Sequence, residues 1–216
     1  MSNLSDFLGG GGGLILRRQL FTASGTWTKS ADIVGDQVFI TAIGGGSSGN
    51  SRTNILSGTS GEYIIRFPVD VSGTTSEIVT VGNGGLRGAS GSNGVAGSAS
   101  SFGSLISVNG GVAPGPENEY LTEISGQNPG TPTDGAKTIK SISGSFGAPT
   151  NYSMASIGGS GLLLDNSGKK ASDHSFGRDE GVGGIGYGAG GSGSRAELQA
   201  SAGASGAVLV EWLEKA

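Results

Sequence analysis

The sequence predicts an all-β fold of short antiparallel strands in a sandwich-like arrangement, with glycine-rich segments between the strands. Short apolar runs bounded by Gly, Ser, Asn or Pro recur along the chain, which is the pattern of antiparallel β-structure. No stretch has the long apolar periodicity of an amphipathic helix. Glycine supplies 45 of the 216 residues and is clustered between the apolar runs. Because the net charge is only -4, we expect a folded chain rather than a disordered one.

The chain begins with a short leader. Leu4, Phe7 and Leu8 stand at helical spacing and are followed by five consecutive glycines, Gly9–Gly13. Five glycines carry too large an entropy cost for a helix or strand interior, so they predict a hinge. We therefore expect residues 1–13 to form an attachment leader, with Leu4, Phe7 and Leu8 as the attachment residues. A frayed terminus without a partner is the alternative. Residues 14–216 are expected to form one glycine-rich β domain.

Seven runs after the hinge predict strands. The alternation of side chains is clearest in Val38–Ile43 and Val208–Leu213, which we expect to be the main core strands. Trp27 and Trp212 stand beside such patterns, which assigns both to the core or to a seam between subunits. The predicted strands are Leu14–Thr22, Gln37–Ile43, Glu62–Val69, Glu77–Val81, Ser104–Val108, Thr138–Ile142 and Ala207–Leu213.

The glycines gather in four clusters between these runs. Glycine chains adopt the polyproline II shape, with three residues per turn and a backbone open to hydrogen bonding. Several such helices side by side can satisfy one another's N–H and C=O groups. Ordered polyglycine II-type helices and ordinary loops are therefore both open, whereas collagen is excluded because no strict Gly-X-Y period is kept. The clusters are Gly44–Gly49, Gly82–Gly97, Gly158–Gly161 and Gly181–Gly206.

Two long insertions interrupt the glycine-rich pattern, at residues 112–134 and 145–180. The first contains four prolines, and the second gathers most of the charged and aromatic residues of this region. Loops on a rigid scaffold are where recognition residues concentrate. Aromatic rings beside amides and charges suit both sugars and protein surfaces. Packing within the loops is the alternative role for the candidate binding residues, which are Tyr120, Asn151, Tyr152, His174, Phe176 and Arg178.

The composition argues against an enzyme and against a bound cofactor or metal. The chain has no cysteine and a single histidine, His174, which excludes His-rich zinc sites and Cys-His nucleophiles. No nucleophile-elbow motif accompanies the histidine. Gly186–Gly191 matches the dinucleotide-binding spacing but lacks the flanking strand and helix that give this pattern meaning. Asp165–Gly168 is typical of a turn, and calcium binding there is a minor alternative without the spacing of an EF-hand loop.

Charge and hydropathy narrow the partners further. The mildly acidic balance argues against nucleic acid as the main ligand. No stretch approaches the roughly 18 apolar residues of a membrane span. The N-terminus lacks the basic start and apolar core of a secretory signal, so we expect synthesis in the cytoplasm.

Six stretches together resemble the glycine-rich domain of bacteriophage tail-fibre and adhesin proteins, in order and in spacing across most of the chain. Each stretch alone is weak, and the ordered set is what carries the resemblance. They are FTASGTWTK (21–29), VFITAIGGGSSG (38–49), GEYIIRFPVDVS (61–72), VTVGNGGLRGASGSNG (79–94), SASSFGSLISVNGG (98–111), and GYGAGGSGS (186–194) with GASGAVLVEW (203–212).

The resemblance implies a virion protein at a tail fibre or tail tip, made in the host cytoplasm. It implies a receptor-binding adhesin whose loops recognise the bacterial surface, through an outer-membrane protein or a glycan. The partners would be other tail or virion proteins, with the chain as a homotrimer or as a monomer capping a trimeric fibre. The alternative is a purely structural virion protein, such as a fibre, collar or capsid decoration. A secreted glycine-rich matrix protein is a third and weaker hypothesis.

Overall fold

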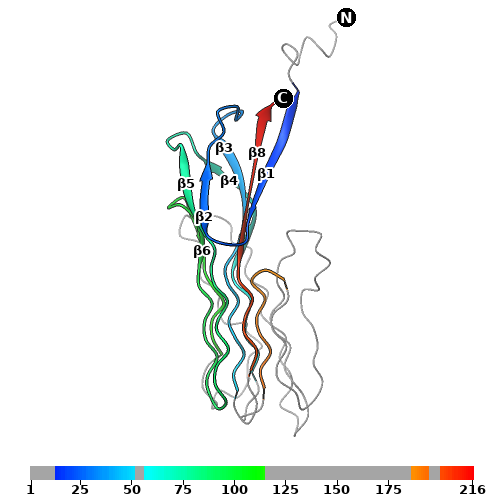
Figure 1. The fold of residues 1–216 in the computed structure, drawn as a ribbon, viewed down its shortest axis with the longest axis vertical. Coiled ribbons are helices and arrows are strands. Elements are labelled where there is room, and N and C mark those ends of the chain that lie inside the picture. Colours follow the sequence, from blue (N-terminus) through cyan, green and yellow to red (C-terminus); the bar gives the residue numbers. More distant parts are fainter. Residues whose placement is uncertain (1–12, 52–55, 115–185, 195–199) are drawn as a thin grey trace, which may run out of the picture.

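The computed structural model describes residues 13–51, 56–114, 186–194 and 200–216 (Figure 1). These residues contain eight β-strands, and no helix that could cross a membrane occurs among them. The all-β prediction is therefore confirmed. The strands are β1 (Leu14–Phe21), β2 (Gly25–Thr28), β3 (Gln37–Ile43), β4 (Tyr63–Asp70), β5 (Ser76–Thr80), β6 (Ser100–Phe102), β7 (Ile106–Val108) and β8 (Ala207–Lys215).

The strands form two four-stranded sheets in which every neighbouring pair is antiparallel. The first sheet has the order β1-β8-β3-β4, and the second has the order β2-β5-β6-β7. The last strand of the chain lies in the centre of the first sheet, between β1 and β3. Closing this sheet therefore requires both ends of the sequence.

The core lies between the two sheets and is built around three aromatic rings. Trp27 of β2 is fully buried, and its ring centroid lies 5.4 Å from that of Phe102 and 5.9 Å from that of Trp212. Tilted and edge-on pairs of this kind contribute about 0.5–1.5 kcal/mol each beyond the area they bury. Both tryptophans thus belong to the core, which is one of the two roles that the sequence predicts.

The two strands predicted as the main core strands, β3 and β8, have the expected alternation. Val38, Ile40 and Ala42 of β3 are buried in the core between the sheets. Val208 and Val210 of β8 occupy the same layer, because Ile40 pairs with Val210 and Ala42 with Val208. Side chains that alternate across a strand place these residues on one face.

Two short strands, β2 and β6, are absent from the sequence prediction. Each contains a single large apolar residue, Trp27 in β2 and Phe102 in β6, so neither has an apolar run. The predicted strand over Ser104–Val108 begins only at Ile106, because residues 103–105 make the turn between β6 and β7. The predicted strand Thr138–Ile142 lies outside the described residues.

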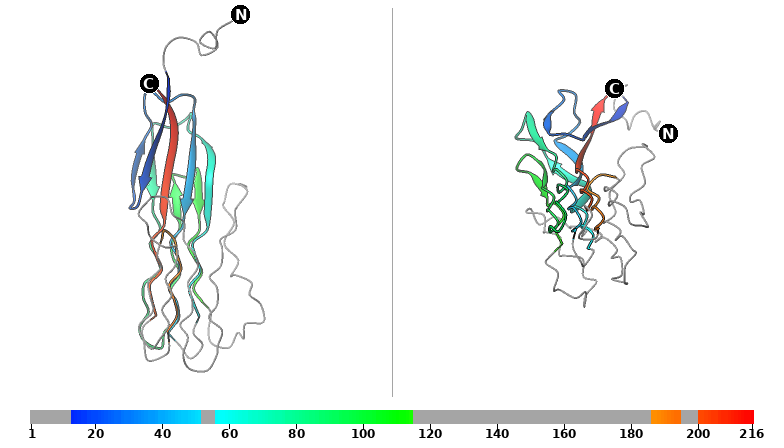
Figure 2. Two further views of the ribbon diagram at one scale, coloured as in Figure 1. Left: turned by 90° about the vertical axis from the view of Figure 1, so that its right-hand side faces the viewer. Right: turned by 60° about the horizontal axis from the view of Figure 1, so that its bottom comes forward.

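Seven glycine-rich segments extend side by side from the sheets toward the end of the molecule opposite the chain ends (Figures 1 and 2). We call them together the glycine bundle. Residues 44–51 form its central segment, which hydrogen-bonds to all six others. The surrounding segments are residues 56–62, 82–88, 92–98, 109–114, 186–194 and 200–206.

The backbone N–H groups of the central segment point to three neighbours in turn. Each neighbour is reached by every third residue, and its accepting carbonyl also shifts by three residues. The bonds to residues 56–62 are Gly44 N to Glu62 O, Ser47 N to Thr59 O and Asn50 N to Leu56 O, at 2.9, 2.9 and 3.0 Å. The bonds to residues 92–98 are Gly45 N to Ser98 O, Ser48 N to Val95 O and Ser51 N to Ser92 O, and those to residues 200–206 are Gly46 N to Ala204 O and Gly49 N to Ser201 O.

The carbonyl groups of the central segment accept bonds from the other three neighbours. Gly45 O accepts from Gly111 N, Gly46 O from Gly85 N and Ser47 O from Gly191 N. The six outer segments are also bonded to one another in a closed ring, in the order 56–62, 109–114, 92–98, 82–88, 200–206 and 186–194. A buried backbone is stable only when its polar groups are paired, and this arrangement pairs them without a sheet.

Glycine is required where two backbones of the bundle touch. A Cβ atom added at Gly46 would overlap the carbonyl oxygen of Ala189, and one at Gly45 would overlap that of Asn83. Serine fits at positions 47 and 48 because its hydroxyl group accepts a hydrogen bond from a backbone N–H group of a neighbouring segment. Ser47 Oγ accepts a bond from Thr59 N at 2.8 Å, and Ser48 Oγ accepts one from Val95 N at 2.8 Å.

Buried polar side chains join the bundle to the sheets. Asn109 N donates to Glu62 Oε2 at 2.8 Å, while Glu62 N donates to Asn109 O at 2.9 Å. On the opposite side, Ser100 Oγ donates to Ile43 O at 2.7 Å and accepts from Gly82 N at 2.9 Å. The strands thus continue into the bundle without a flexible joint at these points.

Candidate functional site

The residues predicted to bind a receptor are Tyr120, Asn151, Tyr152, His174, Phe176 and Arg178, and all of them lie outside the described residues. The same holds for the predicted attachment residues Leu4, Phe7 and Leu8. Of the first insertion, only Val112–Pro114 is described, and the second insertion lies outside entirely. The structure therefore describes the scaffold that carries the predicted site.

The residues just before Pro114 and just after Gly186 are hydrogen-bonded to other segments of the glycine bundle. On the leading side, Val112 O accepts a bond from Thr59 Oγ1 at 3.1 Å, and Gly111 N is bonded to the central segment. On the returning side, Gly188 N donates to Ser205 O at 2.7 Å. The glycine pattern Gly186–Gly191 therefore lies in the bundle, where its backbone groups bond to those of neighbouring glycine-rich segments.

The end of the bundle farthest from the chain ends carries a tight turn. Ser92 N donates to Ala89 O at 3.1 Å and Ser92 Oγ donates to the same oxygen at 2.6 Å, while Gly91 has a positive φ of 78°. Leu86, just before the turn, is 75% exposed. We call the end that carries the turn the distal end. Its described residues include the small polar Ser92 and the exposed Leu86.

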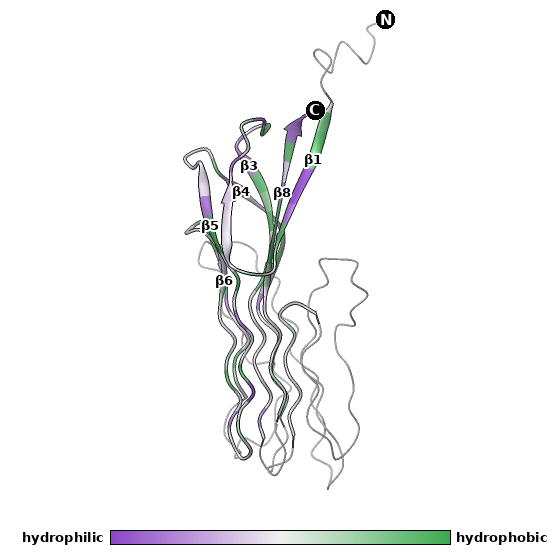
Figure 3. Ribbon diagram, viewed as in Figure 1, coloured by the Kyte–Doolittle hydropathy of each residue, from purple (hydrophilic) through white to green (hydrophobic). Residues whose placement is uncertain are grey.

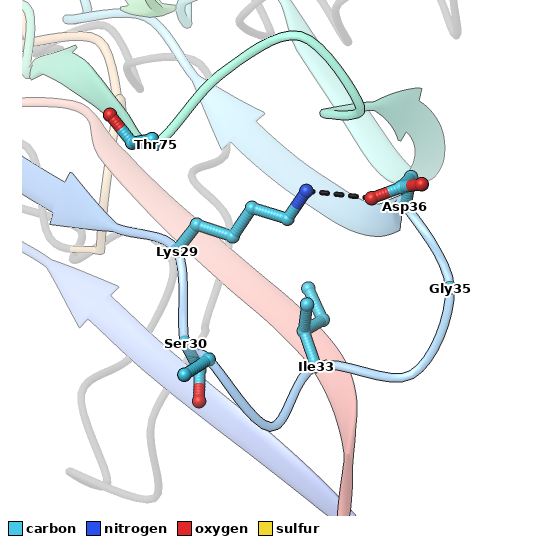
Figure 4. A pocket seen from close by; sticks show the side chains of 7 residues that line it. Lys29, Ser30, Ile33, Gly35, Asp36 and Thr75 are labelled. Atoms are coloured by element: carbon cyan, nitrogen blue, oxygen red, sulfur yellow. Dashed lines mark hydrogen bonds and ion pairs between the residues drawn. The ribbon is translucent and has the colours of Figure 1, made fainter.

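A pocket of about 480 Å³ lies near the chain ends, between the β2–β3 and β4–β5 loops (Figure 4). Lys29 extends into it and is bonded at both sides, with Nζ 2.6 Å from Asp36 Oδ1 and 3.0 Å from Val71 O. This ion pair joins the two ends of the β2–β3 loop, and Asp36 neutralises the charge of Lys29. The lining residues are Lys29, Ser30, Ala31, Ile33, Gly35, Asp36 and Thr75.

No cluster of His, Asp or Glu side chains that could hold a metal occurs in the part of the chain that the structure describes. Two carboxylates, the buried Glu62 and the partly buried Glu214, have shifted pKa values and take part in hydrogen bonds within the fold. Burial raises the pKa of the Glu62 carboxyl, against hydrogen bonds from Asn109 that lower it. Hydrogen bonds from Ser30, Trp212 and Arg17 lower the pKa of Glu214 to about 2.

The outer face of the first sheet contains an unusual arginine. Arg66 sits at the irregular register between β3 and β4 with a φ of 48°, and its N–H donates to Thr41 Oγ1 at 3.0 Å. Its guanidinium group lies 3.0 Å from Glu211 Oε2 and 5.3 Å from the centre of the Phe39 ring. A non-glycine residue with positive φ costs of order 1 kcal/mol, which the bonds to Thr41 and Glu211 offset.

The sequence prediction does not identify the bulge at Arg66. The available signal is the run Ile64-Ile65-Arg66-Phe67, in which two adjacent apolar residues break the alternation of a regular strand. Such a break is typical of a β-bulge.

A family model described as a glycine-rich domain matches residues 21–213. The chain belongs to the glycine-rich domain family. No curated protein matches it. The family match of this glycine-rich domain covers strands β2 to β7, most of β8 and every segment of the bundle, whereas most of β1 lies before its first residue.

Proposed function

We propose that this glycine-rich domain is a bacteriophage tail-fibre or tail-tip protein that binds the host surface as an adhesin. One observation supports the proposal above the others. Gly13 and Ala216 meet at the outer end of the β1–β8 pair, where Ala216 N donates to Gly13 O at 2.7 Å, while the turn at Gly91 lies at the opposite end of the bundle. A scaffold with this polarity suits attachment at one end and recognition at the other.

We further propose that the segments of the glycine bundle are polyglycine II-type helices. Three residues per turn is the repeat of this helix, and the central segment reaches the same neighbour with every third N–H group. A bundle of such helices is stiff because each backbone group is held by a neighbouring segment. Stiffness reduces the entropy lost when loops at its end bind a ligand.

The proposed receptor is an outer-membrane protein or a surface glycan, contacted by residues of the two insertions. Tyr152 and Arg178 are the first residues to test, since tyrosine and arginine are common at the centre of binding surfaces. The partners at the other end are tail or virion proteins, reached through the leader. The proposal includes no catalysis, no cofactor and no nucleic acid.

A purely structural virion role is the second candidate, and exposed apolar residues on the bundle favour it. Val95 and Val112 are 42% and 38% exposed, in addition to Leu86. Apolar side chains on the flank of a scaffold suit contacts with other subunits along its length. In that case the insertions would contact virion proteins instead of the host.

Cell binding and phage adsorption separate the two candidates. For the adhesin, the purified protein binds host cells, and phage lacking residues 145–180 lose adsorption. Tyr152→Ala with Arg178→Ala should weaken binding by about tenfold or more, because loss of one anchor costs at least about 1.4 kcal/mol. Ile78→Ser is the matched control, since Ile78 is 69% exposed on β5, away from the distal end.

Unchanged adsorption after the deletion would reject the adhesin and leave the structural role. Electron microscopy of labelled virions adds a second criterion, since a capsid position excludes host binding by the tail. Light scattering of the purified protein distinguishes the proposed homotrimer from a monomer that caps a trimeric fibre.

A further inference from the structure

Strand β1 is an edge strand with little cover on either face. Among the described strands it pairs with β8 alone, and its first six residues are exposed. Leu14 and Leu16 are 60% and 51% exposed, and Leu213 across from Leu16 is 37% exposed. Figure 3 shows the hydrophobic upper end of β1 and the hydrophilic stretch below it. A long exposed edge of this kind is a template for a further strand.

Every second residue of β1 bonds to β8, and the backbone groups of the residues between them face outward. Ala216 N donates to Gly13 O, which makes this pair a hydrogen-bonded one in the antiparallel register. Hydrogen-bonded pairs alternate with non-hydrogen-bonded pairs along the strands, so the backbone groups of Ile15, Arg17, Gln19 and Phe21 bond to β8. The groups that point away from β8 are therefore the N–H and C=O of Leu14, Leu16, Arg18 and Leu20.

Hydrogen bonds on the side of β8 that faces away from β1 agree with this assignment. Val34 N donates to Leu213 O at 2.8 Å, and Lys215 N donates to Asp32 O at 3.1 Å. Leu213 and Lys215 thus direct their backbone groups away from β1, as the same alternation requires. No described strand pairs with the outer edge of β1.

The side chains beside this open edge combine aliphatic groups with cations. Arg17 is neutralised by Glu214, with Nε 2.9 Å from Oε2. Arg18 and Lys215 form no ion pair within the described residues, and they lie on the same face as Leu14 and Leu16. Arg18 lies across the ladder from Glu211, whose carboxylate is bound to Arg66, so Arg18 and Lys215 are cations beside the apolar patch that have no ion pair of their own among the described residues.

The other edge of the same sheet, β4, is unsuited to a further strand. Pro68 lacks an N–H group, and Arg66 interrupts the strand with its bulge and positive φ. Proline and bulges are the means by which edge strands avoid pairing. The contrast leaves β1 as the edge of this sheet that can accept a partner.

We propose that β1 binds an extended strand of a partner protein that carries both aliphatic and acidic side chains on one face, at every second residue. The aliphatic side chains would cover Leu14 and Leu16, and the acidic ones would neutralise Arg18 and Lys215. Eight outward backbone groups would supply main-chain bonds, as in other cases of strand addition. The proposal goes beyond host binding and stands whether or not the protein is an adhesin.

A second copy of the chain is a poorer occupant of this edge. Antiparallel pairing of two β1 strands over residues 15–21 places Arg18, which has no ion pair among the described residues, opposite Arg18 of the other copy. Like charges directly opposite one another destabilise a strand pair. The arginines of β1 therefore disfavour self-association and favour an acidic partner.

Amide hydrogen exchange on the full-length protein tests the proposal. The probe is a synthetic peptide of eight residues, Val-Thr-Val-Thr-Glu-Thr-Val-Thr, which carries valine and glutamate on one face, and in the control peptide lysine replaces the glutamate. We expect the glutamate peptide to slow exchange at Leu14, Leu16, Arg18 and Leu20 by about tenfold at low salt, while the lysine peptide has no effect. Arg18→Glu should reverse the preference between the two peptides.

Leu16→Pro provides a second variant, since it removes an outward N–H without removing a bond to β8. It should abolish the protection while the thermal midpoint stays close to that of the wild type. The proposal is overturned if neither peptide slows these four amides, or if both slow them equally. Protection that appears without peptide and increases with protein concentration would assign the edge to a second copy and overturn the proposal as well.

Discussion

At the scale of single residues, two glutamates show how strongly the surroundings decide the behaviour of one side chain. Glu62 is buried at the junction of sheets and bundle, where Oε2 accepts a bond from Asn109 and Oε1 has no partner among the described residues. Glu214 accepts bonds from Trp212 Nε1 and Arg17 Nε, both at 2.9 Å. The first carboxylate is poorly solvated by the protein and the second is well satisfied, so their pKa values move in opposite directions.

Replacing Glu62 with glutamine should stabilise the protein near neutral pH. Because burial raises the pKa of Glu62 above its ordinary value of 4.5, its contribution is fully present below 4.5 and is lost as pH rises through the higher folded-state value. We expect Glu62→Gln to gain about 1 kcal/mol near pH 7.5, the scale of one poorly satisfied buried group, and to lose this gain near pH 4. Urea unfolding at the two pH values measures both, and Glu77→Gln on β5 serves as the control. A variant less stable than wild type at both pH values would contradict the prediction.

Replacing Glu214 with glutamine should have the opposite pH dependence. Its pKa is lowered from 4.5 to about 2 by bonds from Ser30, Trp212 and Arg17, so the stability it contributes is present above 4.5 and is lost as pH falls toward 2. The wild type should therefore exceed Glu214→Gln in thermal midpoint at neutral pH, and the two midpoints should converge as the pH is lowered. A difference that stays constant over this range would show that the ionised carboxylate is not the cause.

At the scale of elements, the glycine bundle depends on positions where a side chain has no room. Gly46→Ala should lower the stability by several kcal/mol or prevent folding, because the added methyl group would overlap the carbonyl oxygen of Ala189. Gly73→Ala is the matched control, since nothing lies within 4 Å of a Cβ atom added there. Thermal unfolding of the two variants tests the difference. Equal thermal midpoints for the two variants would mean that the backbone around Gly46 can shift to make room for a methyl group at little cost in stability.

The serines of the bundle should matter through their hydroxyl groups. Ser48 is fully buried and its Oγ accepts the N–H of Val95 at 2.8 Å. Ser48→Ala leaves that N–H without its side-chain partner, so we expect a loss of about 1–3 kcal/mol in urea unfolding. Ser72→Ala on the exposed β4–β5 loop should change the stability little. A loss at Ser48 no larger than at Ser72 would contradict this role for the hydroxyl group.

Strands with a strong apolar alternation could be predicted from the sequence, and weaker ones could not. β3 has the predicted bounds, Gln37–Ile43, because Val38, Ile40 and Ala42 mark one face. β2 and β6 exist through their partners, since Trp27 and Phe102 gain burial only when the other sheet covers them. The clustering of glycine was visible in the sequence. Which segments touch was not, because hydrogen bonds between backbones leave no pattern in side chains.

At the scale of the whole molecule, the sheets and the glycine bundle should unfold together. Ser100 of β6 accepts a buried hydrogen bond from Gly82 of the bundle, and Glu62 bonds to Asn109 where β4 and β7 meet the bundle. Unfolding of either part would therefore leave buried polar groups of the other part without partners. We expect tryptophan fluorescence, which reports on Trp27 and Trp212, to change at the same urea concentration as the amide exchange of Ser47 and Ser48. Two separate transitions would show that the bundle is an independent unit.

The candidate site is predictable only in outline. The sequence places the receptor candidates, such as Tyr152 and Arg178, in an insertion between glycine-rich segments, and the structure places the flanking residues Pro114 and Gly186 on the bundle. The open edge of β1 was missed, because Leu14 and Leu16 look like core residues in a strand pattern. Whether a strand lies at an edge depends on the order of strands in the sheet, which the local sequence does not encode.

The pairing of Gly13 with Ala216, where the two terminal segments enter the first sheet, has a mechanical consequence. A force that pulls the distal end away from both chain ends runs along the strands and segments, so many hydrogen bonds are sheared at once and share the load. A force that pulls the two chain ends apart instead opens the β1–β8 ladder from its tip, one bond after another. The molecule should therefore resist tension along its axis far better than separation of its ends.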